Sequence, residues 1–241
     1  MTLVDILTSL FRGNHSVRHD HSVLLGSGQL SAGSQAVVIG VTDRTAVGVD
    51  EAILLSRHVL NAIEQDGTHP ILVLVDSDSQ RMSKRDELLG LNEFLAHLAK
   101  CLIYADMQGH QTVGLLYGHS AAGAFLATAL ATRALAALPG AEPVVMDLLS
   151  MSKVTKLPIE LLQEKSTTTP VFAPGLENLA RMGAVLTIWK ESVSLAEQLE
   201  ALLNCERDNG DQRDRLGETR RGRPKAAYIA ERVHDLALHS Q

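Results

Sequence analysis

The chain has 241 residues, 45% of them hydrophobic and 21% charged, which is enough for one large domain with a substantial core. Its formal net charge of −6 argues against a nucleic-acid-binding protein, and its two cysteines, Cys101 and Cys205, are too few for a disulfide framework. No apolar run approaches the ~20 residues needed to cross a bilayer, so we expect a cytoplasmic protein.

The first 35 residues combine a short apolar repeat with a polar stretch. Leu3, Ile6, Leu7 and Leu10 follow helical spacing and predict a short amphipathic helix, and Asp5 lies where a signal peptide would be basic. Residues 12–35 are interpreted as a polar loop with one short strand at Val23–Leu25. Its three histidines, His15, His19 and His21, lack the cysteine or carboxylate pattern of a metal site, so we assign no metal.

Strand and helix patterns then alternate along the chain. The predicted elements are a strand at Ala36–Val41, a turn at Thr42–Gly48, a helix at Val49–Glu64, a strand at Ile71–Val75, a polar loop at Asp76–Ser83 and a helix at Arg85–Met107. This order predicts a parallel sheet covered by helices, whose ligands gather at the carboxyl edge of the strands.

The stretch Thr112–Leu130 is the most informative part of the chain. An apolar run at Val113–Tyr117 predicts a buried strand, and Ala124–Ala131 predicts a helix, so the small residues of Gly118–Gly123 form a strand-to-helix turn. Such a turn leaves main-chain N–H groups without partners and lets a ligand approach the backbone. We therefore expect this turn to lie beside the loop Asp76–Ser83 and to hold negative charge on an oxygen.

The remaining sequence predicts further short elements and a charged tail. They are a strand at Pro143–Leu149, helices at Ser152–Glu164 and Leu176–Met182, a strand at Val185–Trp189, and helices at Ser192–Asn204 and Ala226–Leu238. From Glu206 the composition becomes strongly charged, and we interpret its RRGRPK segment as a solvated linker or partner-docking tail. The predicted organisation is an N-terminal helix and loop (1–35), a core domain (36–205) and a tail with a C-terminal helix (206–241).

Two chemistries compete for the turn. GHSAA is close to the G-x-S-x-G nucleophile elbow, which would make Ser120 the nucleophile of an esterase, with Asp147 and either His234 or His239. The alternative is an oxyanion hole in which main-chain N–H groups stabilise the enolate of a thioester, and the small residues Ala121, Ala122 and Gly123 leave room for it. A third possibility is a non-catalytic scaffold subunit.

Several segments resemble the gamma subunit of biotin-independent malonate decarboxylase, from about Val37 onward. They are LVDSDSQRMSKRDELLGLNEFLAHLAKCL, YGHSAAGAFLAT, LPGAEPVVMDLLSMSKVTKLP, TTTPVFAPGLENLARMG and the tail's RDRLG. The resemblance implies an α/β, crotonase-like (ClpP/crotonase) fold with stacked, parallel-rich sheets surrounded by helices. It implies a partner beta subunit of related fold and a malonyl thioester carried on the CoA-like prosthetic group of an acyl-carrier subunit. Acetyl thioester and carbon dioxide would be the products, with no biotin and no cofactor bound by this chain.

The resemblance also assigns roles to individual residues. The segment Ser77–Arg81 matches the place of one oxyanion donor, with Ser79 and Gln80 as candidates, and Gly123 with Ala122 matches the other. This sequence departs from the family pattern in two places, since Ser79 stands where glycine is usual and Ala124 replaces one glycine of a pair.

The residues themselves suggest further roles, each beside a structural alternative. His119 would supply a proton or orient the thioester, or be a locally bonded turn residue. Arg81 and Arg85 would hold the malonyl carboxylate, or Arg85 would form surface ion pairs. Gly118 and Ala121 would give the substrate room. Asp76 and Asp78 would be acid/base groups or, as aspartates after a strand more often do, would cap the turn.

Overall fold

The computed structural model describes residues 1–31, 33–65, 67–170, 173–205 and 210–239. The chain forms two compact units: Met1–Val145 with Ile188–Glu206, and Met146–Thr187 with Arg207–Gln241. The first unit includes the N-terminal 35 residues as well as most of the expected core domain. The two units are described separately below.

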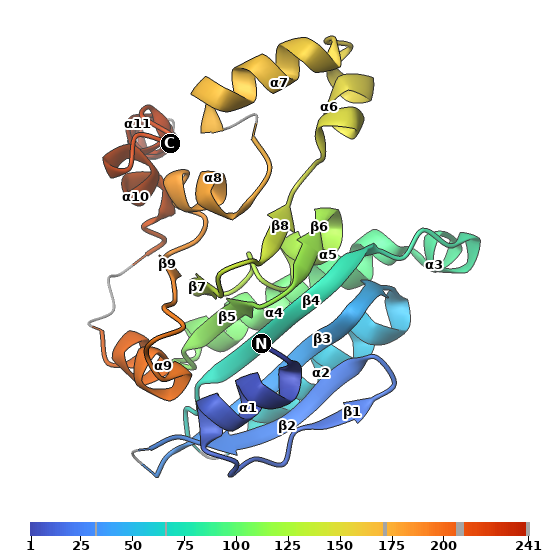
Figure 1. Ribbon diagram of the computed structural model, residues 1–241, viewed down its shortest axis with the longest axis vertical. Coiled ribbons are helices and arrows are strands. Elements are labelled where there is room, and N and C mark those ends of the chain that lie inside the picture. Colours follow the sequence, from blue (N-terminus) through green and yellow to red (C-terminus); the bar gives the residue numbers. More distant parts are fainter. Residues whose placement is uncertain (32, 66, 171–172, 206–209, 240–241) are drawn as a thin grey trace. The chain divides into compact units, whose positions relative to one another are not determined.

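A seven-stranded sheet forms the centre of the first unit, in the order β1-β2-β3-β4-β5-β7-β9 (Figure 1). Its strands are β1 (Arg18–Asp20), β2 (Val23–Gln29), β3 (Gln35–Val47), β4 (Ile71–Gln80), β5 (Thr112–Leu116), β7 (Ala134–Ala137) and β9 (Thr187–Ile188). Strands β3, β4, β5 and β7 pair in parallel, whereas β1 and β2 join antiparallel at one edge. A second, two-stranded parallel sheet contains β6 (His119–Ala121) and β8 (Glu142–Val144). The predicted parallel-rich α/β architecture is therefore confirmed.

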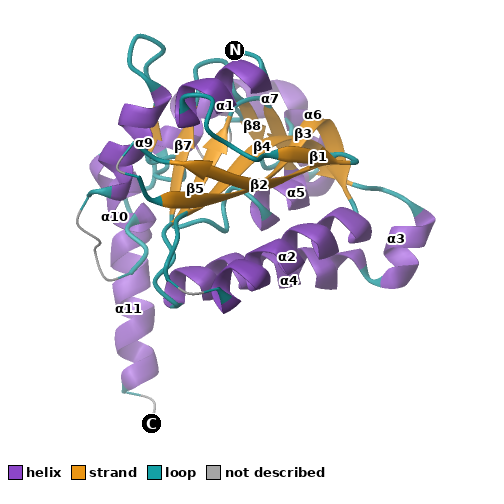
Figure 2. Ribbon diagram, turned by 90° about the horizontal axis from the view of Figure 1, so that it is seen from below, coloured by secondary structure: helices purple, strands orange, loops and turns teal. Residues whose placement is uncertain are grey.

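Helices cover both faces of the large sheet (Figure 2). The helices of this unit are α1 (Leu3–Phe11), α2 (Val49–Glu64), α3 (Lys84–Leu89), α4 (Leu91–Met107), α5 (Ala122–Ala127) and α9 (Leu195–Leu203). Apolar residues of α1 and α9, such as Phe11 and Leu199, pack with Leu72, Leu74 and Leu115 of the sheet in one buried cluster. Helices α2 and α4 lie side by side on the opposite face. The core fixes β4 and β5, whose carboxyl ends emerge together.

Two predicted loops and one predicted turn contain strand residues in the structure. The polar residues 12–35, expected as a loop, contain β1 and β2, and the predicted strand Val23–Leu25 is only the start of β2. The expected turn Thr42–Gly48 and loop Asp76–Ser83 are largely the ends of β3 and β4, which pair through Thr45↔Ser77 and Val47↔Gln80. Main-chain hydrogen bonds between β3 and β4 hold these residues in strands although their polar side chains are more typical of loops. A bulge at Asp43 and Arg44, both left-handed (φ +58° and +51°), shifts the register.

Helix and strand ends also differ from the predictions. The predicted helix Arg85–Met107 is broken at Gly90, whose φ of +83° ends α3. The predicted strand Pro143–Leu149 is wrong after Val144, where β8 ends. The Asp147 side chain accepts a hydrogen bond from the Ser150 amide (2.8 Å) and caps a helix that begins at Leu148. Strand β7 was not predicted, since its sequence ALAA carries no β-branched or aromatic residue.

The second unit is helical. It contains α6 (Leu148–Thr155), α7 (Ile159–Thr168), α8 (Leu176–Arg181), α10 (Arg213–Thr219) and α11 (Ala226–Leu238). The Arg220 guanidinium donates to the carbonyls of Ala180, Val185 and Leu186, at 2.7–2.8 Å. Gly217 and Gly222 lie so close to the carbonyls of Met182 and Arg181 that a Cβ would approach them within 2.4 and 2.1 Å. Within the RRGRPK segment, Arg220 and Gly222 thus pack against the chain around α8, whereas Arg221, Arg223, Pro224 and Lys225 are exposed. Residues 206–209 lie outside the described part.

Two negative findings concern the part of the chain that the structure describes. None of its helices is both long enough and apolar enough to cross a membrane. Within the same residues, no group of three histidines, cysteines or carboxylates is arranged to hold a metal ion. His15 instead forms an isolated bridge with Gly28, and His19 lies in β1.

Candidate functional site at the carboxyl edge of the sheet

Three alternate residues on β4 form the base of the site. Asp76, Asp78 and Gln80 are two positions apart, so their side chains project from the same face of the strand. Each meets the segment 118–123: Asp76 at the His119 amide, Asp78 at the His119 ring and Gln80 at the Gly123 amide. The predicted proximity of the segments 76–83 and 118–123 is confirmed.

Asp76 fixes the backbone at the start of this segment. Its Oδ1 accepts the His119 N–H at 2.9 Å, and its Oδ2 accepts the Arg44 N–H at 3.3 Å. Gly118 makes this possible, because a Cβ there would lie 2.3 Å from Asp76 Oδ1. Asp76 is therefore a structural tie among β3, β4 and β6, in keeping with its interpretation as a capping residue.

The Gly123 amide is occupied in this structure. It donates to Gln80 Oε1 at 2.8 Å, so the partner is the carbonyl oxygen of a side-chain amide. The residue before it, Ala122, has a φ of +48°, which is a strained conformation for a residue with a Cβ. Gln80 is half-buried and at the end of β4, and its Nε2 contacts Met82 Sδ at 3.9 Å. The Gly123 N–H thus donates to a carbonyl oxygen of the acyl type, that of the half-buried Gln80 side chain.

Ser120 faces the protein interior. Its side chain is fully buried, and its Oγ lies 3.2 Å from Ser77 Oγ, also fully buried. The other expected triad members have different partners: Asp147 caps α6, and His239 Nδ1 contacts its own helix at Asp235 O. His234, 73% exposed, lies near Asp235. The contacts of these residues give no support to a nucleophile elbow.

His119 lies between two carboxylates. Its Nε2 is 3.8 Å from Asp78 Oδ1, and its Nδ1 is 3.8 Å from Glu142 Oε2. The Nδ1 atom is buried and has no hydrogen-bond partner among the described residues, although the side chain as a whole is 16% exposed. Glu142 was not found by sequence analysis, because only the pairing of β6 with β8, with His119 opposite Glu142, brings it here.

The two arginines are already engaged. Arg81 pairs with Glu51, and its Nη2 also donates to the Ala46 carbonyl at 3.3 Å. Arg85, 58% exposed, forms a two-bond pair with Asp50 at 2.7 and 3.0 Å. Arg85 thus forms a surface ion pair, as expected if its role is structural, and Asp50 is the bidentate partner.

The other expected residues lie nearby. Ser79 is half-buried, and its Oγ contacts the Gln80 carbonyl at 3.1 Å. Ala121 is half-buried at the end of β6, on the same side of that strand as His119. Tyr117, which follows β5 and was not an expected site residue, donates its hydroxyl to the Val41 carbonyl at 3.5 Å, and burial strongly raises its pKa.

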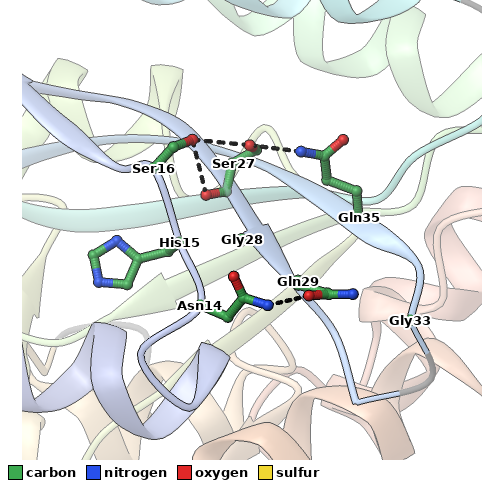
Figure 3. Close-up of a pocket in the computed structure, with 8 residues that line it drawn as sticks. All are labelled: Asn14, His15, Ser16, Ser27, Gly28, Gln29, Gly33 and Gln35. Carbon is green, nitrogen blue, oxygen red and sulfur yellow. Dashed lines mark hydrogen bonds between the residues drawn. The ribbon is translucent and has the colours of Figure 1, made fainter.

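Two cavities lie elsewhere, near the amino end of β3. The larger, about 430 Å³, is lined by polar residues around Asn14, Ser27 and Gln35, several of which bond to one another (Figure 3). The second, about 310 Å³, is lined by residues of α2 such as His58 and Asn61. Neither contains a residue of the expected site, and the side chains lining the larger cavity already satisfy much of their own hydrogen bonding.

Comparison with curated proteins gives a carboxyltransferase as a relative. The chain is 33% identical over 168 residues to the malonyl-S-ACP:biotin-protein carboxyltransferase MADD of Malonomonas rubra. The alignment covers 66% of this chain, which spans only 55% of that relative's length.

Solved structures share the fold. A Pseudomonas malonate decarboxylase hetero-tetramer in complex with coenzyme A matches with a TM-score of 0.73 at 22% identity, over 98% of this chain and 97% of the other. A Pseudomonas malonate decarboxylase MdcD-MdcE hetero-dimer matches with a TM-score of 0.70 at 24% identity, over 89% and 95%. Transcarboxylase 12S matches with a TM-score of 0.64 at 14% identity, over 86% and 42%. The expected crotonase-like fold is confirmed.

A family model provides the assignment. The model described as malonate decarboxylase gamma subunit matches residues 42–237, which include every strand from β4 to β9 and the whole site described above. This chain therefore belongs to the malonate decarboxylase gamma subunit family.

Proposed function

We propose that this chain is a subunit of a decarboxylase that converts a malonyl thioester, carried on an acyl-carrier subunit, into the acetyl thioester and carbon dioxide. The family match over residues 42–237 is the observation that carries the proposal. The site geometry supports it, because a main-chain N–H at the carboxyl edge of the sheet already holds an acyl-type oxygen.

The reaction needs a site that stabilises an enolate. When the bond between the α-carbon and the carboxyl group breaks, its electron pair moves toward the thioester and the carbonyl oxygen becomes negative. In our proposal the amide of Gly123 binds that oxygen, with the amides of Ala122, Ser79 and Gln80 as further donors. Each well-aimed donor is worth roughly 2.7–4 kcal/mol. The Gln80 side chain leaves Gly123 when the thioester enters.

The malonyl carboxylate must lose its charge as neutral carbon dioxide, so a permanent ionic grip would oppose the reaction. We propose that Arg81 and Arg85 attract this carboxylate while keeping their pairs with Glu51 and Asp50. Gly118 and Ala121 leave space beside the segment. Ser120, being buried, supports the turn and does not attack the substrate.

The proposal includes partners. We propose a related beta subunit that completes the active site and an acyl-carrier subunit whose CoA-like prosthetic group holds the substrate, with no cofactor bound by this chain. The hetero-dimer and hetero-tetramer of the Pseudomonas relatives support this arrangement. The identity with a biotin-protein carboxyltransferase favours one competing function, transfer of the carboxyl group to a biotin-bearing protein.

Reconstitution tests the main proposal. The chain is co-purified with its beta and carrier subunits, and carbon dioxide release from the malonyl thioester is measured with and without a biotin-bearing acceptor. We expect carbon dioxide to be released without the biotin-bearing acceptor. Acetyl thioester that forms only when the acceptor is present would favour the transferase.

Two variants separate the remaining alternatives. Ser120→Ala should keep much of the activity, whereas a serine esterase would lose nearly all of it. Gly123→Val should abolish activity with the complex intact, and an active Gly123→Val complex would support the scaffold alternative.

A further inference from the structure

Two carboxylates beside the His119 ring suggest that this histidine takes part in the reaction in addition to the oxyanion donors. One carboxylate faces each ring nitrogen, with Asp78 near Nε2 and Glu142 near Nδ1, both at 3.8 Å. These separations are too long for hydrogen bonds, but they place one carboxylate close enough to each ring nitrogen to interact with it through charge. The buried Nδ1 has no hydrogen-bond partner within the described chain. Buried polar atoms without such a partner are uncommon and often have a functional role.

The position of the ring relative to the proposed oxyanion donor is also informative. Asp78 and Gln80 are two residues apart on one face of β4, a separation of about 7 Å along the strand. The first side chain meets the His119 ring and the second meets the Gly123 amide. A thioester whose carbonyl oxygen replaced Gln80 Oε1 would therefore lie beside the histidine, and we place its α-carbon toward the ring.

We infer that His119 is the proton donor to the enolate and that Glu142 and Asp78 are its positioning residues. This inference rests on the proposed decarboxylase function. After carbon dioxide leaves, the α-carbon forms a C–H bond with the proton of Nε2, and the electron pair of the broken N–H bond remains on the ring. Glu142, whose side chain is 72% exposed, attracts the charged ring from the side of Nδ1. Asp78, with 55% of its side chain exposed, connects Nε2 to water, which returns the proton.

Deuterium exchange isolates this step. In the reverse direction the same group removes a methyl proton from the acetyl thioester, so the complete complex should exchange these protons with D2O without any malonyl substrate. The probe is the acetyl form of the carrier subunit, and exchange is followed by mass spectrometry. Carbon dioxide release from the malonyl form is measured in parallel.

The variants test each residue separately. His119→Gln should slow exchange by at least 100-fold, the lower range for loss of a general acid or base. Added imidazole should partly restore it. Glu142→Gln and Asp78→Asn should each slow exchange about 3–10-fold while the KM for the malonyl thioester changes less than twofold. Glu64→Gln, at an exposed position of α2, is the matched control and should exchange at the wild-type rate.

The outcomes distinguish the inference from the function on which it rests. A His119→Gln complex that exchanges within twofold of wild type overturns the inference and leaves the decarboxylase intact. Loss of exchange that is not restored by imidazole, together with loss of subunit assembly, assigns His119 a structural role and overturns it too. A wild-type complex that neither releases carbon dioxide nor exchanges overturns both.

Discussion

Asp76 shows how one side chain organises the site at the scale of single residues. Its two oxygens accept amides from the bulge of β3 and from β6, and its Oδ1 lies where a Cβ at position 118 would clash. The carboxylate cannot move away from an added methyl group without giving up one of these bonds. A small residue is therefore needed at position 118 for packing, whatever the substrate requires.

Gly118→Ala tests this packing. The new Cβ would lie 2.3 Å from Asp76 Oδ1, so we expect a loss of about 1–3 kcal/mol in the free energy of unfolding, measured by urea denaturation. Gly123→Ala is the matched control, because its Cβ would meet only the ends of two side chains, Gln80 Oε1 at 3.0 Å and Leu95 Cδ1 at 3.4 Å. Equal losses for the two variants would contradict the role given to Asp76.

At the scale of elements, Asp86 joins α2 to α3. Its carboxylate is buried and accepts the Ser83 hydroxyl and, at 3.1 Å, the amide of Val49 at the start of α2. The Ser83 hydrogen bond, followed by that from Val49, holds the pKa of Asp86 below its usual 3.8. The junction beside the site therefore depends on an ionised carboxylate.

This junction should make stability depend on acid pH. Because the folded pKa of Asp86 is lower than the unfolded one, its contribution is complete above pH 3.8 and is lost as pH falls through the folded value. Unfolding free energies measured from about pH 6 to pH 2 should fall more steeply for wild type than for Asp86→Asn. Parallel curves for the two proteins would show that this carboxylate does not contribute, and Glu64→Gln should follow wild type.

Arg220 is the corresponding tie in the second unit. Its guanidinium donates to three carbonyls around α8, a fork that a lysine ammonium does not reproduce. We expect Arg220→Lys to lower the unfolding free energy by about 2 kcal/mol, given the worth of hydrogen bonds from charged groups. Arg221→Lys, at a neighbouring exposed position, should change it little. Thermal unfolding of the two variants measures the difference, and equal melting temperatures would argue against the tie.

At the scale of the whole molecule, the two units differ in how much apolar surface they bury. The first contains fully buried strands such as Ile71–Val75 and Leu115–Leu116. In the described part of the second unit the buried apolar residues are Leu162, Ala173, Leu179, Val185 and Ala227. Ala227 is the one buried residue of the thirteen in α11.

Hydrogen exchange of the isolated chain should follow this difference. Amides of β4 and β5 should exchange at rates set by global unfolding, whereas those of α11 should exchange much faster because little buried surface opposes its opening. Mass spectrometry with peptide resolution measures both regions in one experiment. Protection of α11 equal to that of β4 would contradict this ranking.

Composition and periodicity by themselves determined the helix Val49–Glu64 and the buried part of β4, because these signals lie within short segments. The resemblance of several sequence segments indicated the family, which the family model confirms. Tertiary structure alone decided that polar residues 76–80 continue a strand, that Glu142 faces His119 and that Gln80 occupies the Gly123 amide. Each of these depends on main-chain pairing between segments distant in sequence. Such pairing can offset an unfavourable local composition, which is why no local pattern predicted them.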